Sequence, residues 1–287
     1  MVGDRMNWDK ATRKILKAAA AAIRLSVRRG EMLVWLSDGH LGNWDGADDA
    51  RDNGGVTEKA VDWYIGQLAK FIIGGDFYEL MEVRRPETIY AHPRWRRITL
   101  KILANLALYI LGNHDPPRKM VPFLKKFDIN EELIVEAAWI GAEILLFHGF
   151  QYDFFNKGGW VTRVVGWIIR HIWAHIQREI GSKLSPRTNP KLSGGIKSAE
   201  TRLAKHLNRR VLTGHRHTPE IELLGAGAVF IDGGCGTGAE GVYCVEITYD
   251  TICPVLWDRD TGERRVIKTY YRRVGEDMIH GDIQVNP

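Results

Sequence analysis

Residues 32–40 read Met-Leu-Val-Trp-Leu-Ser-Asp-Gly-His, a short apolar run that ends in an acidic residue and a histidine. Such a run is typical of a buried strand that leads into a loop. Four similar runs follow, each ahead of a polar side chain: residues 71–73 before Asp76, 108–111 before Asn113, 144–147 before His148, and 211–213 before His215 and His217. Helical patterns at residues 59–70 and 95–107 separate the first three runs. Strands that alternate with helices predict an α/β fold, whose ligands gather at the carboxyl ends of the strands.

The composition of the 287 residues is that of a globular protein, because 45% are hydrophobic and 26% are charged. The three cysteines, Cys235, Cys244 and Cys253, form neither a CxxC zinc motif nor an even disulfide set, so we expect reduced thiols and a cytoplasmic location. No stretch approaches the roughly 18 apolar residues of a transmembrane helix. The excess of 40 basic over 35 acidic residues favours phosphate-bearing substrates, nucleic acid or an anionic membrane surface as partners.

The N-terminal residues 1–30 are expected to contribute a basic helix ahead of the main domain, which spans residues 31–287. The helical pattern covers residues 7–29, with Asn7 as the N-cap, and seven basic residues between positions 10 and 29 are accompanied by no acid. We expect this helix to pack on the domain through its apolar side. Contact of its basic face with a membrane surface or with nucleic acid is the alternative.

The pattern changes in the second half of the chain. Residues of about 150–208 are expected to form an inserted helical lid, with a helix at 160–180, a loop at 181–195 and a second helix at about 196–208. After Pro219, β-type runs with glycine-rich turns predict a second, largely antiparallel sheet. Nearer the N-terminus, the acidic loop that follows His40 is expected to be solvated; it contains Asp45, Asp48, Asp49 and Asp52.

The polar residues at the strand ends form one candidate metal-ligand set, consisting of Asp38, His40, Asp76, Asn113, His148, His215 and His217. Carboxylate and amide oxygens mixed with imidazoles suit Mn²⁺, iron or Zn²⁺ better than Ca²⁺, which takes oxygen ligands alone. So many ligands are too numerous for one tetrahedral ion and fit two ions that share a bridging carboxylate. Such a pair lowers the pKa of a bound water and stabilises the oxygens of a phosphoryl group during displacement.

The order of these motifs resembles the signature of calcineurin-like metallophosphoesterases. The matching blocks lie between residues 38 and 217 and read Asp38-Gly39-His40, Gly75-Asp76, Gly112-Asn113-His114-Asp115, His148-Gly149 and Gly214-His215-Arg216-His217. The resemblance implies a four-layer α/β/β/α sandwich, in which two central sheets are flanked by helices. It also implies a di-metal-dependent phosphohydrolase.

The resemblance assigns a role to each matching residue. One metal would be held by Asp38, His40 and His217, and the other by Asn113, His148 and His215, with Asp76 as the bridge. His114 would stabilise the developing phosphate charge or protonate the leaving oxygen, as an imidazole can near neutral pH. Asp115 would orient His114 through a hydrogen bond. The expected cofactors are two Mn²⁺ ions, and the same ligands also accept iron or Zn²⁺.

Within that family, residues 36–42 and 214–219 are most similar to UDP-2,3-diacylglucosamine hydrolases, which cleave a pyrophosphate in lipid A synthesis and carry helical insertions over the site. By this resemblance the tryptophan-rich lid, with Arg163 and Arg170, is expected to hold an acyl chain and a phosphate. The alternative is a lid helix that packs on the core or on a second subunit. Two departures separate the chain from those enzymes, because His114 stands in place of an arginine and Phe150 in place of an aspartate.

The function predicted from the sequence is therefore hydrolysis of a phosphoester or pyrophosphate, with a nucleotide-sugar lipid as the more specific hypothesis. A cytoplasmic protein, with peripheral membrane contact as an extension of that hypothesis, fits such a substrate. A nuclease or nucleotide phosphodiesterase on the same metal core is the alternative, favoured by the net charge of +5. A non-catalytic protein-binding scaffold is a more remote alternative, since no expected ligand is missing.

Overall fold

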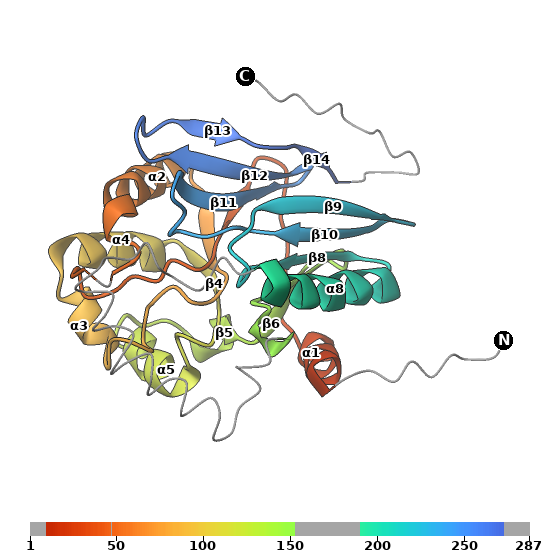
Figure 1. The fold of residues 1–287 in the computed structure, drawn as a ribbon, viewed down its shortest axis with the longest axis horizontal. Coiled ribbons are helices and arrows are strands. Elements are labelled where there is room, and N and C mark those ends of the chain that lie inside the picture. The colour runs from red at the N-terminus through yellow and green to blue at the C-terminus, as the bar shows by residue number, and fades with distance from the viewer. Residues whose placement is uncertain (1–9, 47, 153–189, 273–287) are drawn as a thin grey trace.

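The computed structural model of the chain describes residues 10–46, 48–152 and 190–272 (Figure 1). Within these residues two β-sheets stack against each other, and helices cover the outer face of each sheet. The four-layer α/β/β/α sandwich predicted from the sequence is therefore confirmed. None of the described helices has both the length and the apolar character needed to cross a lipid bilayer.

The larger sheet among the described residues has the order β13-β12-β11-β2-β3-β4-β5, with β14 paired to β12. Its centre is parallel, since β3 pairs in parallel with both β2 and β4, whereas β11 runs antiparallel to β2. The strands of this sheet are β2 (Met32–Leu36), β3 (Lys70–Ile73), β4 (Leu106–Ile110), β5 (Ile134–Val135), β11 (Gly241–Thr248), β12 (Thr251–Asp258), β13 (Arg264–Val266) and β14 (Tyr270–Tyr271).

The smaller sheet in the described part of the chain has the order β1-β6-β7-β8-β10-β9. Strand β8 pairs in parallel with β7 and β10, and the hairpin partners β6 and β9 run antiparallel to β7 and β10. The strands of this sheet are β1 (Arg24–Leu25), β6 (Ala137–Ile140), β7 (Ile144–Phe147), β8 (Arg210–Thr213), β9 (Glu220–Gly225) and β10 (Ala228–Asp232).

The helices lie on the two outer faces of the sandwich. The larger sheet is covered by α2 (Gly54–Gly66), α3 (Pro86–Tyr90), α4 (Pro93–Ala104) and α5 (Pro117–Lys125), and the smaller sheet by α1 (Lys10–Ala20) and α8 (Pro190–Leu207). Short 3-10 turns occur at Arg51–Asn53, Glu131–Leu133 and Phe150–Tyr152. Helices α3, α4 and α5 each begin with proline, whose fixed φ suits the first helical position and whose missing N–H is not needed there.

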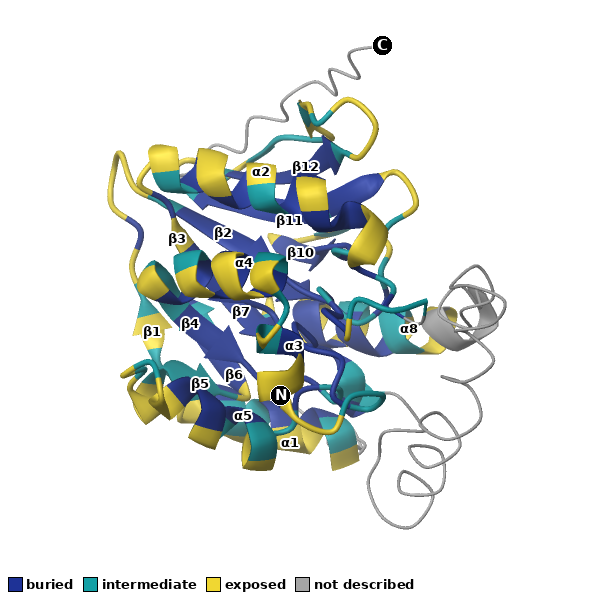
Figure 2. Cartoon of the chain, turned by 90° about the vertical axis from the view of Figure 1, so that its left-hand side faces the viewer, coloured by how far each residue is buried: buried dark blue, intermediate teal, exposed yellow. Residues whose placement is uncertain are grey.

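Three apolar layers hold the sandwich together, and strand β2 contributes to two of them. Leu33 and Trp35 face the space between the sheets, whereas Val34 and Leu36 face the helices of the outer layer. Side chains alternate between the faces of a strand, so a strand that is buried on both faces needs a continuous apolar run. Figure 2 shows the consequence, with the sheets buried and the helices exposed along one side. Each large side chain that is fully buried contributes about 1.5–3 kcal/mol to stability.

The N-terminal helix is shorter than predicted, because the expected helix over residues 7–29 ends at Ala20. Residues Arg24–Leu25 form β1, which pairs in parallel with β6. The N–H groups of Trp139 and Gly141 donate to the carbonyls of Ile23 and Leu25 at 2.9 and 2.8 Å. This long-range pairing outcompetes local helix propensity. Helix α1 itself packs on the smaller sheet through the buried Ile15 and Ala19, as expected of a docked helix.

The strands after Pro219 do not form a sheet of their own, so the prediction of a second, largely antiparallel sheet is wrong in that respect. Strands β9 and β10 extend the smaller sheet, and β11 to β14 extend the larger one. All five residues of β10 are buried. A strand buried along its whole length needs cover on both faces, which the two-sheet sandwich provides.

Most of the predicted lid, including residues 153–189 with Arg163 and Arg170, lies outside the described residues. A helix, α8, is present where the second lid helix was predicted, but it packs on the smaller sheet through Leu203 and Ala204, as part of the sandwich. It begins at Pro190, inside the segment that its proline, serine and glycine content predicted as a loop, because proline is favourable at the start of a helix. Elsewhere, the three cysteines are free and buried, as expected of reduced thiols.

Candidate metal centre

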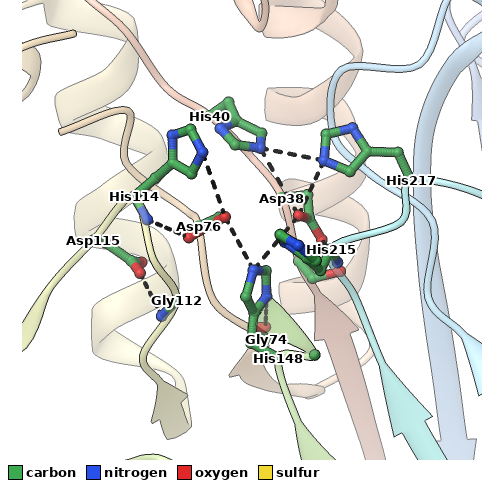
Figure 3. Close-up of polar contacts among 12 residues, drawn as sticks. Asp38, His40, Gly74, Asp76, Gly112, His114, Asp115, His148, His215 and His217 are labelled. Atoms are coloured by element: carbon green, nitrogen blue, oxygen red, sulfur yellow. Dashed lines mark hydrogen bonds and ion pairs between the residues drawn. The ribbon is translucent and has the colours of Figure 1, made fainter. Parts of the chain in front are cut away.

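The polar residues predicted from the strand ends come together beyond those ends, and Figure 3 labels all of them except Asn113. They follow the carboxyl ends of β2, β3 and β4 in the larger sheet and of β7 and β8 in the smaller one. The strands are parallel within each set, so their polar ends lie on the same side. Residues far apart in the chain, such as Asp38 and His217, therefore come within 3.1 Å of each other.

Three groups of side chains in the described residues could each hold a metal ion, and within each group the ligand atoms lie within 4.8 Å of one another. The first group consists of Asp38, His40 and His217, the second of Asp38, Asp76, His148 and His215, and the third of His40, Glu79 and His114. The first group consists of residues predicted to hold one metal. The second contains His148 and His215, predicted for the other metal, and Asp76, the predicted bridge, and Asp38 belongs to both groups. Asn113 lies beside the second group, since the next residue, His114, donates its N–H to Asp76.

Three atoms of the centre are buried and have no hydrogen-bond partner among the described residues: Asp38 Oδ1, Asn113 Oδ1 and His148 Nε2. Asp38 Oδ1 makes ion-pair contacts with His217 Nε2 at 3.1 Å and His148 Nε2 at 3.9 Å. His148 Nε2 lies 3.0 Å from Asp76 Oδ2. Buried polar atoms are almost always hydrogen-bonded, so an unsatisfied cluster needs an explanation. Two carboxylates, an amide oxygen and imidazole nitrogens form a donor set that fits divalent metal ions.

The backbone at these positions is unusual. Asp38, His40, Asp76, His215 and His217 all have positive φ, between 43° and 69°. This left-handed conformation is uncommon outside glycine and costs free energy unless the surroundings hold it. Strain of this kind clusters at functional sites, and here half of the ten non-glycine residues with positive φ in the described chain belong to one cluster.

Backbone groups fix the orientation of the ligands. His114 N–H donates to Asp76 Oδ1 at 2.7 Å, which leaves Oδ2 directed at the cluster. His148 Nδ1 lies 2.9 Å from the carbonyl oxygen of Gly74. A carbonyl only accepts, so Nδ1 of His148 carries a proton, and once the ring is neutral Nε2 carries the lone pair that a metal requires. Gly112 leaves room for the Asp76 carboxylate, because a Cβ at position 112 would lie 2.0 Å from Asp76 Oδ1.

The electrostatics of the cluster favour bound cations. Burial raises the pKa of Asp76, but the neighbouring histidines, His148 first, outweigh burial and hold it well below its usual range. Burial lowers the pKa of His148 and His217, yet nearby carboxylates overcome it and raise both values to about 10. For His148 the carboxylates are Asp76 and Asp38, and for His217 the main one is Asp38. The cluster therefore binds protons tightly in the absence of other cations.

Glu79 was not predicted from the sequence as part of the centre; it is a carboxylate that is buried with only 3% of its surface exposed. Its Oε2 lies 2.9 Å from His40 Nδ1, and its Oε1 lies 2.6 Å from His114 Nδ1. Burial raises the pKa of Glu79, but the imidazoles of His114 and His40 outweigh it, so this pKa also lies well below its usual range. One acidic residue within the apolar stretch Phe77-Tyr78-Glu79-Leu80 was the signal that could have revealed it.

Asp115 makes hydrogen bonds other than the predicted one to His114. Its Oδ1 accepts from Gly112 N–H at 2.6 Å, and its Oδ2 accepts from Phe77 N–H and the Tyr109 hydroxyl. Asp115 therefore holds the loop after β4 against the loop after β3, and the carboxylate at His114 Nδ1 is that of Glu79. The prediction failed because sequence adjacency to His114 does not bring the carboxylate to its ring.

No model of a known protein family matches the chain, and no curated protein matches it. Several solved structures are similar. A dimetal phosphatase from Danio rerio is 12% identical, with a TM-score of 0.42 over 84% of this chain and 99% of that chain. A predicted phosphoesterase from Streptococcus pneumoniae is 17% identical, with a TM-score of 0.35 over 84% and 98%. The GAP50 anchor of the Plasmodium inner membrane complex is 11% identical, with a TM-score of 0.44 over 85% and 90%.

Proposed function

We propose that this protein is a di-metal phosphohydrolase of the calcineurin-like metallophosphoesterase type. The observation that supports it most is the pair of ligand groups that share Asp38, together with the buried polar atoms that have no hydrogen-bond partner among the described residues. Two divalent ions bound there would supply Lewis-acid charge and a water of lowered pKa for attack on phosphorus. Mn²⁺ is the ion we expect, and iron or Zn²⁺ suits the same donors.

His114 is proposed as the group that donates a proton to the leaving oxygen. Its side chain keeps 16% of its surface exposed, whereas those of Asp38 and His148 have none. It therefore lies where a bound phosphoester could reach it. Its Nε2 is 4.0 Å from Asp76 Oδ2, at the edge of the ligand cluster, and its Nδ1 contacts Glu79. A positioned imidazole is well suited to proton transfer near neutral pH.

Which phosphoester or pyrophosphate the protein cleaves is a prediction from the sequence. A nucleotide-sugar lipid would depend on the lid residues Arg163 and Arg170, which lie outside the described residues. A nuclease or nucleotide phosphodiesterase would use the same metal centre and would differ in the residues around it that bind the substrate. A protein-binding scaffold has no need for a cluster of buried polar atoms that lack hydrogen-bond partners among the described residues, so we favour an enzyme over it.

The test is hydrolysis of bis-p-nitrophenyl phosphate, p-nitrophenyl phosphate and a UDP-sugar by metal-stripped protein titrated with Mn²⁺. Asp76→Asn removes a charged ligand with little change in shape and should reduce turnover by about 10³-fold, equivalent to several kcal/mol of lost metal-assisted stabilisation. Asp62→Asn is the matched control, because Asp62 is a half-exposed carboxylate on α2 that pairs with Lys101. Failure of the protein to bind Mn²⁺, Fe²⁺ or Zn²⁺ would refute the proposal. Bound metal without hydrolysis of any of the three substrates would favour a binding role.

A further inference from the structure

Trp35 lies on β2 three residues before Asp38, and its side chain is fully buried between the two sheets. Its indole ring packs against one glycine from each sheet. A Cβ at Gly74, which follows β3, would lie 2.3 Å from Cζ2 of the ring. A Cβ at Gly233, which follows β10, would lie 2.4 Å from Nε1. The ring therefore fills the space between the ends of β3 and β10 and limits how closely the two sheets approach there.

The polar edge of the ring is hydrogen-bonded to the loop that carries Asp38. Trp35 Nε1 donates to Ser37 Oγ at 3.2 Å, and Ser37 Oγ donates to the carbonyl oxygen of Gly234 at 3.2 Å. An indole N–H only donates and a carbonyl only accepts, so the direction of both bonds is fixed. Together they join the end of β2 in the larger sheet to the loop after β10 in the smaller sheet.

Gly74 connects the ring to two members of the second ligand group. Its carbonyl oxygen lies 2.9 Å from Nδ1 of His148, and Asp76 follows it two residues later. Its N–H donates to the carbonyl oxygen of Leu36 at 2.7 Å, which holds Gly74 against the strand that carries the ring. A shift of Gly74 would therefore move Asp76 and His148 together.

Ser37 connects the ring to the other two members of the second group. Asp38 is the next residue, and a Cβ at Gly214, directly before His215, would lie 2.6 Å from Ser37 Oγ. The two histidines of the first group lie further along these loops, three residues beyond Ser37 and Gly214. The contacts of the ring thus converge on the second group.

We propose that Trp35 is a positioning residue whose ring acts as a spacer, so that the four ligands of the second group stand at the separation that a metal ion requires. The proposal rests on the metal centre of the proposed function and requires a bound metal, but no hydrolysis. A smaller apolar side chain at position 35 would leave a gap between Gly74 and Gly233 and would donate no hydrogen bond to Ser37. The loops would move into that gap, and ligand geometry tolerates displacements of only about 0.5 Å.

Trp35→Phe removes the indole N–H and the wider ring. We expect this variant to bind one of two Mn²⁺ ions about 10–100-fold more weakly in calorimetry, as loss of a residue that orients ligands typically does, and the other ion as wild type does. Trp257→Phe is the matched control. The Trp257 indole is also buried and also donates to a hydroxyl at 3.2 Å, that of Tyr64, but on the outer face of the larger sheet. Wild-type affinity for both ions in Trp35→Phe would overturn the proposal, as would an equal loss in Trp257→Phe.

A double-mutant cycle assigns the weakened ion. His148→Ala removes a ligand of the second group, so the ion of that group should already be weakened or lost. Trp35→Phe should then change the affinity for the remaining ion by less than about 2-fold. A further loss of about 10-fold would mean that the ring acts on the first group, contrary to the proposal.

Size complementarity tests the contact between the ring and Gly233. Gly233→Ala adds a methyl group that meets the ring, while the next nearest neighbour, the carbonyl oxygen of Thr213, is 3.4 Å away. We expect this variant to weaken the same ion as Trp35→Leu, which empties part of the space. In the double variant the methyl group occupies that space, so the loss of affinity should be smaller than the product of the two single losses. Losses that simply multiply would show that the ring does not set this separation.

The wild-type protein provides a test that needs no variant to fold. Its ten tryptophans give ten indole ¹H–¹⁵N resonances, which NOE contacts assign. Zn²⁺ is diamagnetic, so binding of two Zn²⁺ ions should shift the indole resonance of Trp35 and leave that of Trp257 in place. A Trp35 resonance that does not move on Zn²⁺ binding would overturn the proposal.

These readouts separate the two proposals. If Trp35→Phe weakens one ion while wild type hydrolyses no phosphoester, the positioning role holds and the phosphohydrolase fails. If wild type is an active phosphohydrolase and Trp35→Phe binds both ions as wild type does, the positioning role fails alone. A wild-type protein that binds no metal would overturn both.

Discussion

The backbone N–H of His215 donates a hydrogen bond of 2.8 Å to Oδ2 of Asp38, across a separation of 177 residues. His114 N–H makes the equivalent bond to Oδ1 of Asp76 at 2.7 Å. Each carboxylate thus uses one oxygen to hold a loop that carries another residue of the centre, and directs its second oxygen at the cluster. The contact that joins the loops after β2 and β8 therefore also sets the geometry of the ligands.

Gly214 is the residue that permits the bond between His215 and Asp38. A Cβ at this position would lie 2.4 Å from Asp38 Oδ2 and 2.8 Å from Ser37 Cβ. We expect Gly214→Ala to displace Asp38, to weaken Mn²⁺ binding by at least about 10-fold, and to destabilise the fold by roughly 1–3 kcal/mol, as overpacking does. Calorimetry and thermal unfolding measure the two effects. Gly55→Ala on α2 is the control, because a Cβ there has no neighbour within 4 Å. Unchanged Mn²⁺ affinity in Gly214→Ala would show that Asp38 is not held in this way.

The proposed role of His114 predicts a dependence on the leaving group. A poor leaving group needs a proton in the transition state, whereas p-nitrophenolate leaves with little help. We expect His114→Gln to reduce kcat by about 10²–10⁴-fold with a phenyl phosphodiester, and by less with the p-nitrophenyl diester. Metal content should stay at the wild-type level. Equal losses with both substrates would argue for charge stabilisation and against proton donation, and loss of metal would place His114 among the ligands.

The raised pKa values of His148 and His217, both about 10, predict that metal ions compete with protons. At pH 7 both imidazoles are protonated in the metal-free protein, and a metal binds only after these protons leave. The affinity for Mn²⁺ should therefore rise with pH between 6 and 8, by up to about 10-fold per unit for each proton released. Calorimetry in buffers of different ionisation enthalpy counts the protons directly. An affinity that is independent of pH would contradict the protonated state of both histidines.

The raised pKa values of His148 and His217 also predict how the stability of the metal-free protein changes with pH. A histidine whose pKa rises on folding stabilises the fold at pH values below its ordinary pKa of 6.5, and this contribution is lost as the pH rises toward about 10. The metal-free protein should therefore become less stable between pH 7 and 10, and saturating Mn²⁺ should reverse the trend. Thermal unfolding with and without a chelator measures both curves.

Much of the fold was predictable because the central strands are buried on both faces. The runs at 32–36 and 144–147 match β2 and β7 at both ends, since a continuous apolar run followed by a polar loop leaves little choice of boundary. Which sheet each C-terminal strand joins was not predictable, because nothing local distinguishes β10 beside β8 from β11 beside β2. Strand β1 was missed for the same reason, since its partners lie more than 100 residues away along the chain.

The candidate ligands were predictable because each follows the end of a strand, but the residues that support them were not. Glu79 has no motif and is recognised by its two imidazole partners. Asp48 contradicts the expectation of a solvated acidic loop, since it is buried and accepts from Trp44 N–H, Ala50 N–H and the Trp95 indole. Burial raises the pKa of Asp48 to about 6 despite these donors. Composition describes how acidic a loop is, and only packing determines which of its acids is buried.

Arg216 lies between His215 and His217 in the loop after β8. Its side chain is only 5% exposed; its Nη1 lies 2.7 Å from Glu220 Oε1, and its Nε lies 3.8 Å from Asp232 Oδ2. Asp232 and Glu200 are fully buried, and burial raises the pKa of both carboxyls while Arg216 opposes that rise. Arg216→Met removes the cation and leaves these carboxyls without it, which should cost about 3–5 kcal/mol at neutral pH.

The pH dependence distinguishes this mechanism from a simple loss of packing. A buried carboxyl whose pKa is raised on folding destabilises the fold as the pH rises above its ordinary value, because the unfolded chain ionises it more readily. The deficit of Arg216→Met should therefore be smaller at pH 5 than at pH 8, measured by denaturant unfolding. Lys14→Met, which breaks the exposed pair with Glu136, should cost less than about 1 kcal/mol. A loss of stability in Arg216→Met that does not change with pH would mean that Arg216 acts through its methylene groups. The Mn²⁺ affinity of the variant would then show whether the loop that carries His215 and His217 keeps its shape.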